Sequence, residues 1–137
     1  MADNTAAVLN SSPELITAFS EALEGAGFAV VAAHVADIQD GSLDLVAWID
    51  VHDPAVILYD LPRPFERHWN FLRLLRETDS LKARCWVLTT TDKKSVEAVI
   101  DPSTMAETLI GTPFTMEEAV AAVRACIDRV GAPAAQV

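Results

Sequence analysis

Short apolar runs alternate along the chain with longer segments that have helical periodicity. Each run has the length of a β-strand and ends at polar or turn-forming residues. The five runs cover residues 6–9, 28–33, 55–59, 85–89 and 108–110. Because they are continuous rather than alternating in polarity, they are typical of parallel strands that are buried on both faces.

The segments between these runs are predicted to be helices. The two clearest carry N-terminal signals: Ser12 stands directly before Pro13, and Thr115 stands three residues before Glu118 in a capping-box pattern. The predicted helices cover residues 13–26, 43–52, 65–77, 93–100 and 115–130. Strands that alternate with helices predict a three-layer α/β/α domain with a five-stranded parallel sheet.

The 137 residues fit one domain, and a hydrophobic content of 51% excludes a disordered chain. We expect the domain to cover residues 6–130, with an N-terminal tail over 1–5 and a C-terminal tail over 131–137. Gly131 and Pro133 are expected to end the last helix. Residues 44–51 are more apolar than one buried stripe requires, so Trp48 is expected to be exposed.

The net charge of -10 limits the kinds of partner that the chain is expected to bind. It repels phosphate backbones and anionic lipids, and no apolar run approaches the roughly 20 residues that span a bilayer. We therefore expect a cytoplasmic protein with protein partners, and neither nucleic-acid nor membrane binding. Residues 63–84 depart from this balance, with six basic and three acidic residues. They form either a docking face for an acidic partner or a solvated helix face.

Cysteines and histidines give no pattern of a metal site. Cys85 and Cys126 are 41 residues apart without a CxxC motif, so we expect two reduced thiols in the core. His34, His52 and His68 have no partner at a recognisable spacing and are expected at the surface.

Ligand sites in open parallel sheets lie beyond the carboxyl ends of the strands, where the strand order reverses. In this chain, Asn10 and Ser11 follow the first predicted strand, Asp60 follows the third, and Thr89 ends the fourth. Asp60 is the carboxylate among these strand ends. One interpretation is a plain carboxylate that is hydrogen-bonded to Ser11, Asn10 or Thr112.

Residues 8–15, 56–64, 88–90 and 110–114 together resemble the receiver domain of bacterial response regulators. The likeness includes a proline four residues after Asp60, and it covers nearly the whole chain. It implies a flavodoxin-like topology with strand order 2-1-3-4-5 and a role in two-component signal transduction or a phosphorelay.

The resemblance also implies roles for single residues. Asp60 takes the phosphoacceptor position, Thr89 the switch hydroxyl and Leu109 the position of the aromatic switch. The Thr112–Pro113 peptide bond is predicted to be cis, as in the resembled family. For Thr89, the plainer interpretation is a β-branched residue that suits a strand end.

Three positions depart from the family pattern. Asn10 and Ser11 stand where the family has an acidic pair, and Thr112 stands where it has a lysine. Asp60 with the carbonyl of Pro62 is a poor anchor for magnesium, which favours several carboxylates and waters. Phosphoryl transfer would lack the charge neutralisation that drives it.

We therefore expect a stand-alone, degenerate pseudo-receiver that is no enzyme, needs no cofactor and acts as a protein interaction module. Its partners would be a histidine kinase, a downstream effector or a second copy in a homodimer. A working receiver is the alternative, with phosphate accepted on Asp60 and Lys93 or Lys94 replacing the lost lysine. A small α/β enzyme or cofactor-binding domain is the third, although no Gly-rich phosphate loop is found.

Overall fold

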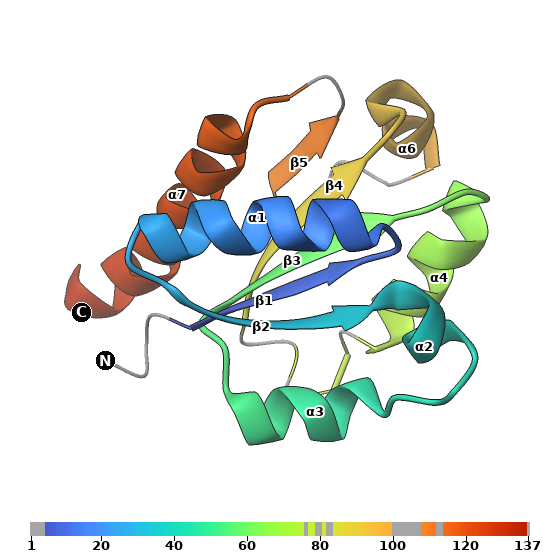
Figure 1. The fold of residues 1–137 in the computed structure, drawn as a ribbon, viewed down its shortest axis with the longest axis horizontal. Helices are drawn as coiled ribbons and strands as arrows, with labels where there is room; N and C mark the ends of the chain where they lie inside the picture. Colours follow the sequence, from blue (N-terminus) through green and yellow to red (C-terminus); the bar gives the residue numbers. More distant parts are fainter. Residues whose placement is uncertain are drawn as a thin grey trace.

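The computed structural model describes residues 5–75, 77–78, 81, 84–99, 108–111 and 114–136 (Figure 1). Strands and helices alternate through most of the chain. The elements in chain order are β1 (Thr5–Asn10), α1 (Pro13–Gly25), β2 (Ala29–His34), α2 (Val35–Gln39), α3 (Leu45–His52), β3 (Val56–Leu61), α4 (Phe65–Leu75), β4 (Cys85–Thr90), α6 (Lys93–Val99), β5 (Thr108–Gly111) and α7 (Met116–Gln136).

The strands form a parallel sheet in the order β2-β1-β3-β4-β5. The predicted α/β class, the parallel pairing and the order 2-1-3-4 of the first four strands are confirmed. Beyond them, β5 pairs with β4 through residues 108–111.

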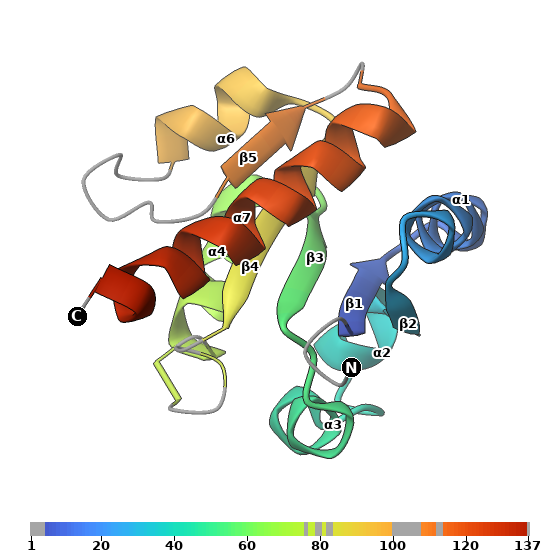
Figure 2. The same cartoon turned by 90° about the vertical axis from the view of Figure 1, so that its left-hand side faces the viewer.

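Helices cover both faces of the sheet and enclose a separate core on each (Figures 1 and 2). Helices α1 and α7 cover one face, where Phe19 and Val123 are buried together with strand residues such as Leu58. Helices α2, α3, α4 and α6 contribute to the larger core on the other face, which includes Trp69 and Trp86.

Strand burial follows position in the sheet. Nearly every residue of β1, β3 and β4 is buried, as the continuous apolar runs predict. β2 differs, because all its residues are exposed or only half-buried. Among the described strands it has one neighbour, so the expectation of burial on both faces is wrong for this edge.

The predicted helix starts are confirmed by their caps. Ser12 Oγ accepts a hydrogen bond from the backbone N–H of Leu15 at 3.3 Å. Thr115 and Glu118 form a reciprocal capping box, with N···O distances of 3.0 and 3.1 Å. These bonds satisfy N–H groups that have no partner inside the helix.

The last helix does not end at Gly131, as the sequence predicted, and α7 continues to Gln136. A glycine costs a helix only about 1 kcal/mol relative to alanine, and an interior proline, at about 3 kcal/mol, can kink a helix without ending it. Neither residue therefore forces an end.

The connection between β2 and β3 contains two helices instead of the predicted single helix over 43–52. The short α2 has only five residues and two buried side chains, Val35 and Ile38, which is too few to show a period. On α3, Trp48 is half-buried and packs against the core, contrary to the expected exposure, whereas Val51 is 78% exposed. The surplus apolar surface thus lies one turn further along α3.

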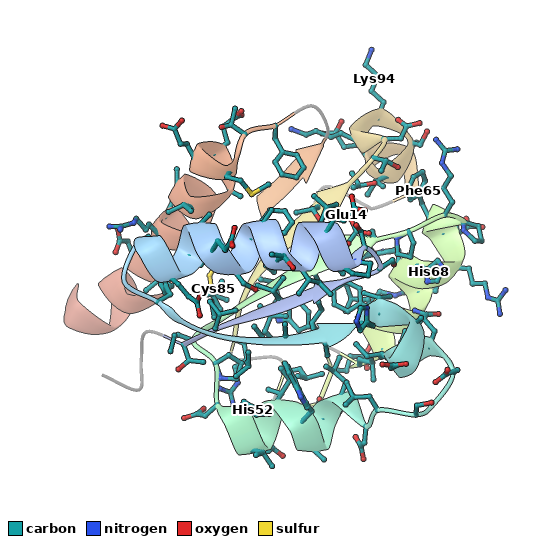
Figure 3. All side chains as sticks on the ribbon, viewed as in Figure 1. Glu14, His52, Phe65, His68, Cys85 and Lys94 are labelled. Atoms are coloured by element: carbon teal, nitrogen blue, oxygen red, sulfur yellow. A yellow bond between two sulfur atoms is a disulfide. The ribbon has the colours of Figure 1, made fainter. Side chains whose placement is uncertain are left out.

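Cys85 and Cys126 are both buried, as expected, but they form a disulfide (Figure 3). The expectation of two reduced thiols is wrong because α7 packs across β4 and brings the two Cα atoms to 6.0 Å, within the range that a disulfide bridges. A spacing of 41 residues carries no local signal for this contact. No helix in the described ranges combines the length and apolar character that a membrane crossing needs.

Candidate functional site

The carboxyl ends of β1, β3 and β4 bring the predicted site residues to one edge of the sheet. Leu9 lies opposite Tyr59 in the pairing of β1 with β3, so Asn10 ends β1 at the level of Asp60. Asp60 in turn lies opposite Thr89 in the pairing of β3 with β4. The parallel register therefore assembles the edge that the sequence predicted.

Asp60 is half-buried and makes a hydrogen bond with the strand beside it. Its Oδ1 accepts from the Thr89 hydroxyl at 3.0 Å, and Thr89 is only 2% exposed. Burial raises the pKa of Asp60, and the bond from Thr89 opposes that shift. The expected partners were Ser11, Asn10 or Thr112; the structure pairs Asp60 with Thr89 because their backbones face each other in the sheet.

The two residues at the acidic-pair position serve the turn into α1. Asn10 is buried, and its Oδ1 accepts a hydrogen bond from the backbone N–H of Ser12 at 2.9 Å. Ser12 itself caps α1, and Ser11 is exposed to solvent. The side-chain oxygen of Asn10 is therefore already used to hold the backbone turn that leads into α1.

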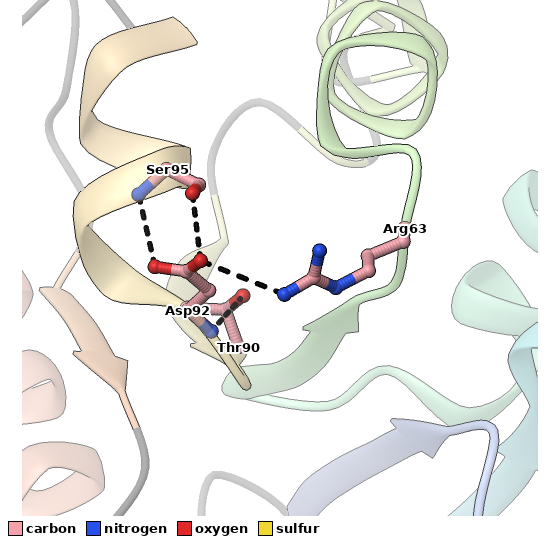
Figure 4. A network of polar contacts seen from close by, with 4 residues as sticks. All are labelled: Arg63, Thr90, Asp92 and Ser95. Atoms are coloured by element: carbon pink, nitrogen blue, oxygen red, sulfur yellow. Dashed lines mark hydrogen bonds and ion pairs between the residues drawn. The ribbon is translucent and has the colours of Figure 1, made fainter.

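A second carboxylate, Asp92, lies just beyond the end of β4 and was missed from the sequence (Figure 4). It accepts from Ser95 twice, from the backbone N–H at 3.2 Å and from the hydroxyl at 2.7 Å, at the start of α6. Its own N–H donates to Thr90 Oγ1 at 3.3 Å. The signal was present in the sequence, because an aspartate directly ahead of a predicted helix is a preferred N-cap.

Arg63 connects the loop after β3 to this cap. Its Nη2 lies 3.5 Å from Asp92 Oδ2, and its guanidinium lies 5.2 Å from the centre of the Phe65 ring. The bonds from Ser95 lower the pKa of Asp92 most, and the charges of Arg63 and Lys94 lower it further. The Arg63–Pro64 peptide bond is cis.

The β5 side of the edge is described in part. Leu109 lies in β5 opposite Leu88. Thr112 and Pro113, including the predicted cis bond, lie outside the described residues. Gly111 lies against the start of α6, so close that an added Cβ would stand 2.5 Å from the Cβ of Lys93.

An open depression of about 470 Å³ lies beside this edge. It is lined by Thr91, Asp92, Lys93, Lys94 and Glu97. Lys94 extends away from the molecule in Figure 3. Lys93 and Lys94, the two possible substitutes for the lost lysine, both line this depression.

The three histidines lie on different elements, and His34 ends β2 opposite Asn10 in the pairing of β1 with β2. His34 and His52 are exposed, as predicted. His68 is half-buried on α4, and burial is the largest cause that lowers its pKa.

The donor set does not fit a magnesium ion. Over the described ranges, no three His, Cys, Asp or Glu side chains are grouped so that they could hold a metal. One oxygen of Asp60 accepts from Thr89, Asn10 Oδ1 accepts from a backbone N–H, and Asp92 is held by Ser95 and Arg63. A hard divalent cation needs several free carboxylate or water oxygens in octahedral array.

Comparison with known proteins identifies the fold. No family model matches the chain, and no curated protein matches it either. Solved structures do: a sensor protein from Polaromonas sp. JS666 has a TM-score of 0.76 at 16% identity, over 92% of this chain and 97% of that chain. A response regulator receiver protein from Sinorhizobium medicae WSM419 has a TM-score of 0.68 at 16% identity, over 93% and 97%.

A response regulator from Thermotoga maritima has a TM-score of 0.66 at 20% identity, over 92% of this chain and 98% of that chain. Each of these solved chains is covered almost completely. The chain therefore has the fold of bacterial response-regulator receiver domains, including the order of its first four strands.

Proposed function

We propose that this chain is a receiver-like protein interaction module in signal transduction that lacks the usual magnesium-dependent phosphorylation. The observation that carries the proposal is the use of Asn10: its side-chain oxygen closes the turn into α1 at the position where a carboxylate would hold a metal. Asp60 then stands at the edge with about one negative charge, where the resembled family concentrates about three around magnesium.

The electrostatics of the Asp60 side chain point the same way. Burial raises the pKa of Asp60, and Thr89 already donates to one of its oxygens. A phosphoryl group brings several negative oxygens, which preorganised cations must neutralise in the transition state. Arg63, the cation closest along the chain, is paired with Asp92.

Incubation with acetyl phosphate and magnesium, followed by intact-mass measurement, tests the proposal. The wild type is expected to gain no phosphoryl mass, whereas a rebuilt Asn10→Asp, Ser11→Asp, Thr112→Lys variant is expected to gain one. Asp60→Asn in the rebuilt background is the matched control that abolishes the gain. A phosphoryl mass on the wild type that disappears in Asp60→Asn would overturn the proposal.

The alternative function is a working receiver that accepts phosphate from a histidine kinase. The hydrogen bond between Thr89 and Asp60 favours it, because it places a buried hydroxyl beside the acceptor carboxylate. Lys93, which begins α6 against Gly111, would supply the missing cation. Loss of phosphorylation in Lys93→Gln but not in Lys94→Gln would establish that role.

The partner and location expectations belong to the same proposal. A module of this kind binds a histidine kinase, a downstream effector or a second copy of itself in the cytoplasm, without cofactor or enzymatic activity. Sedimentation at tens of micromolar tests the homodimer. A bound cofactor spectrum would favour the small α/β enzyme instead.

A further inference from the structure

Helix α4 presents a basic outer face next to the candidate site. Its buried side consists of Phe65, Trp69 and Leu72, which pack into the larger core. At about 100° per residue, the opposite side is formed by side chains that are all exposed. We call this set, together with the preceding loop residue, the α4 outer face: Arg63, Glu66, Arg67, Asn70, Arg73 and Leu74.

Charge separates this face from the rest of the molecule. The whole chain carries -10, whereas the α4 outer face contains three arginines and one glutamate. Glu66 lies on the same flank of the helix as Arg73, two turns before it. The other basic residue described in this stretch, Arg84, is committed elsewhere, because it binds the Asp53 carboxylate and the Pro54 carbonyl.

An apolar residue lies beside the charges. Leu74 is 65% exposed; it directly follows Arg73 and lies two turns beyond Arg67 on the same side of the helix. Half-buried Phe71 borders it on the same helix. A leucine that stays in water beside arginines is typical of a surface with an apolar centre and a charged rim.

The α4 outer face reaches the candidate site through Arg63. Arg63 is 70% exposed at its side chain, lies over the Phe65 ring and pairs with Asp92, the N-cap of α6. Asp92 is therefore an acidic group of this chain that already occupies one end of the α4 outer face. An external carboxylate would compete with Asp92 for the same guanidinium (Figure 4).

We propose that the α4 outer face is the docking surface for an acidic segment of a partner protein, with acidic side chains against Arg63, Arg67 and Arg73 and an apolar side chain over Leu74. The inference rests on the proposed interaction function and names the chemistry of its partner. The carboxylates of the segment replace Asp92 at Arg63, so docking reaches the edge of the sheet that holds Asp60.

The test uses a fluorescent synthetic peptide of about 15 residues, with leucine at helical spacing and glutamate elsewhere. Matched peptides carry glutamine or lysine in place of glutamate. Fluorescence anisotropy is expected to show saturable binding of the glutamate peptide to the full chain, weakened by salt, with neither control peptide bound. Equal binding of the glutamate and glutamine peptides, or no binding of the glutamate peptide, would overturn the proposal.

Charge-reversal variants locate the surface. The double variant Arg67→Glu, Arg73→Glu is expected to weaken peptide binding about tenfold. Lys94→Glu on α6 is the control, with the same change of charge at each substituted site, and is expected to change the affinity by about twofold at most. Arg67→Lys with Arg73→Lys is expected to keep binding, and thermal unfolding checks that each variant folds. Equal weakening by Lys94→Glu would show nonspecific charge attraction and overturn the proposal.

Competition by Asp92 gives a second readout. Asp92→Asn keeps an N-cap residue for α6 but removes the carboxylate that pairs with Arg63, so peptide affinity is expected to rise about threefold. Glu97→Gln, an exposed position on α6, is the control and is expected to leave affinity unchanged. Unchanged affinity in Asp92→Asn would exclude Arg63 from the surface.

The same measurements also distinguish an acidic protein segment from two other possible ligands of the α4 outer face, a membrane and a second copy of the chain. Binding of anionic vesicles through Arg67 and Arg73 in place of the peptide, or a salt-sensitive dimer that the same reversals abolish, would overturn the choice of an acidic protein segment. Because these measurements involve no phosphorylation, their failure is distinguishable from failure of the proposed function.

Discussion

Helices α1 and α4 hold equivalent places in the fold but present opposite surfaces. Each follows a strand that ends at the candidate site, and each buries large apolar side chains against the sheet, Phe19 and Leu23 on α1 and Trp69 and Leu72 on α4. The exposed charges of α1 are Glu14, Glu21 and Glu24, whereas α4 and its preceding loop expose one acid, Glu66, and three arginines, Arg63, Arg67 and Arg73.

The difference shows which side of a helix the fold constrains. The inner sides must both be apolar because they cover the two faces of one sheet. The outer sides contact water, where single charges contribute little to folding stability. Folding therefore does not require the exposed arginines of α4 to be basic, and they are available for binding a partner.

The largest expected effect lies on the inner sides. Phe19→Ala and Trp69→Ala each remove a buried aromatic side chain and are expected to lower the free energy of unfolding by about 3–5 kcal/mol. Glu21→Ala and Arg67→Ala, the outer controls, are expected to stay within about 0.5 kcal/mol. Urea unfolding measures all four, and a loss at Trp69 as small as that at Arg67 would break the equivalence of the two helices.

A smaller effect is expected at the start of α1. Ser12→Ala removes the hydroxyl that accepts from Leu15 N–H and should cost about 1 kcal/mol of unfolding free energy. Ser11→Ala changes an exposed neighbour and serves as the control, with a change within about 0.5 kcal/mol. Equal losses in the two variants would contradict the assignment of the cap.

The smallest effect concerns pH. Because burial raises the pKa of Asp60 above its unfolded value, the folded state holds this proton more tightly than the unfolded state. Stability from this group is therefore fully present below the unfolded pKa and is lost as pH rises through the folded pKa. Asp60→Asn removes the ionisation and keeps an oxygen that accepts from Thr89.

The stability of Asp60→Asn relative to wild type is thus expected to increase as pH rises from about 3 to about 7. Urea midpoints of both proteins at each pH measure the difference. A difference that is independent of pH would show that burial does not control this carboxylate.

Much of the fold was predictable because its signals are local. Continuous apolar runs indicated the buried strands β1, β3 and β4, and Ser12 and Thr115 marked helix starts, since a cap acts within three or four residues. That Asp60 and Thr89 lie at one edge of the sheet followed from the same reasoning, because parallel strands end together, but their hydrogen bond was not predicted.

Contacts between distant residues were decided by the tertiary structure. The sequence by itself determined most of the strands and helices, the apolar sides of the longer helices, and that Asn10 and Ser11 carry no negative charge. Only sheet register and helix packing decided that Cys85 meets Cys126, that Arg63 reaches Asp92 and that β2 is an exposed edge. Such contacts depend on how elements pack in space, and no periodicity within a single segment encodes that packing.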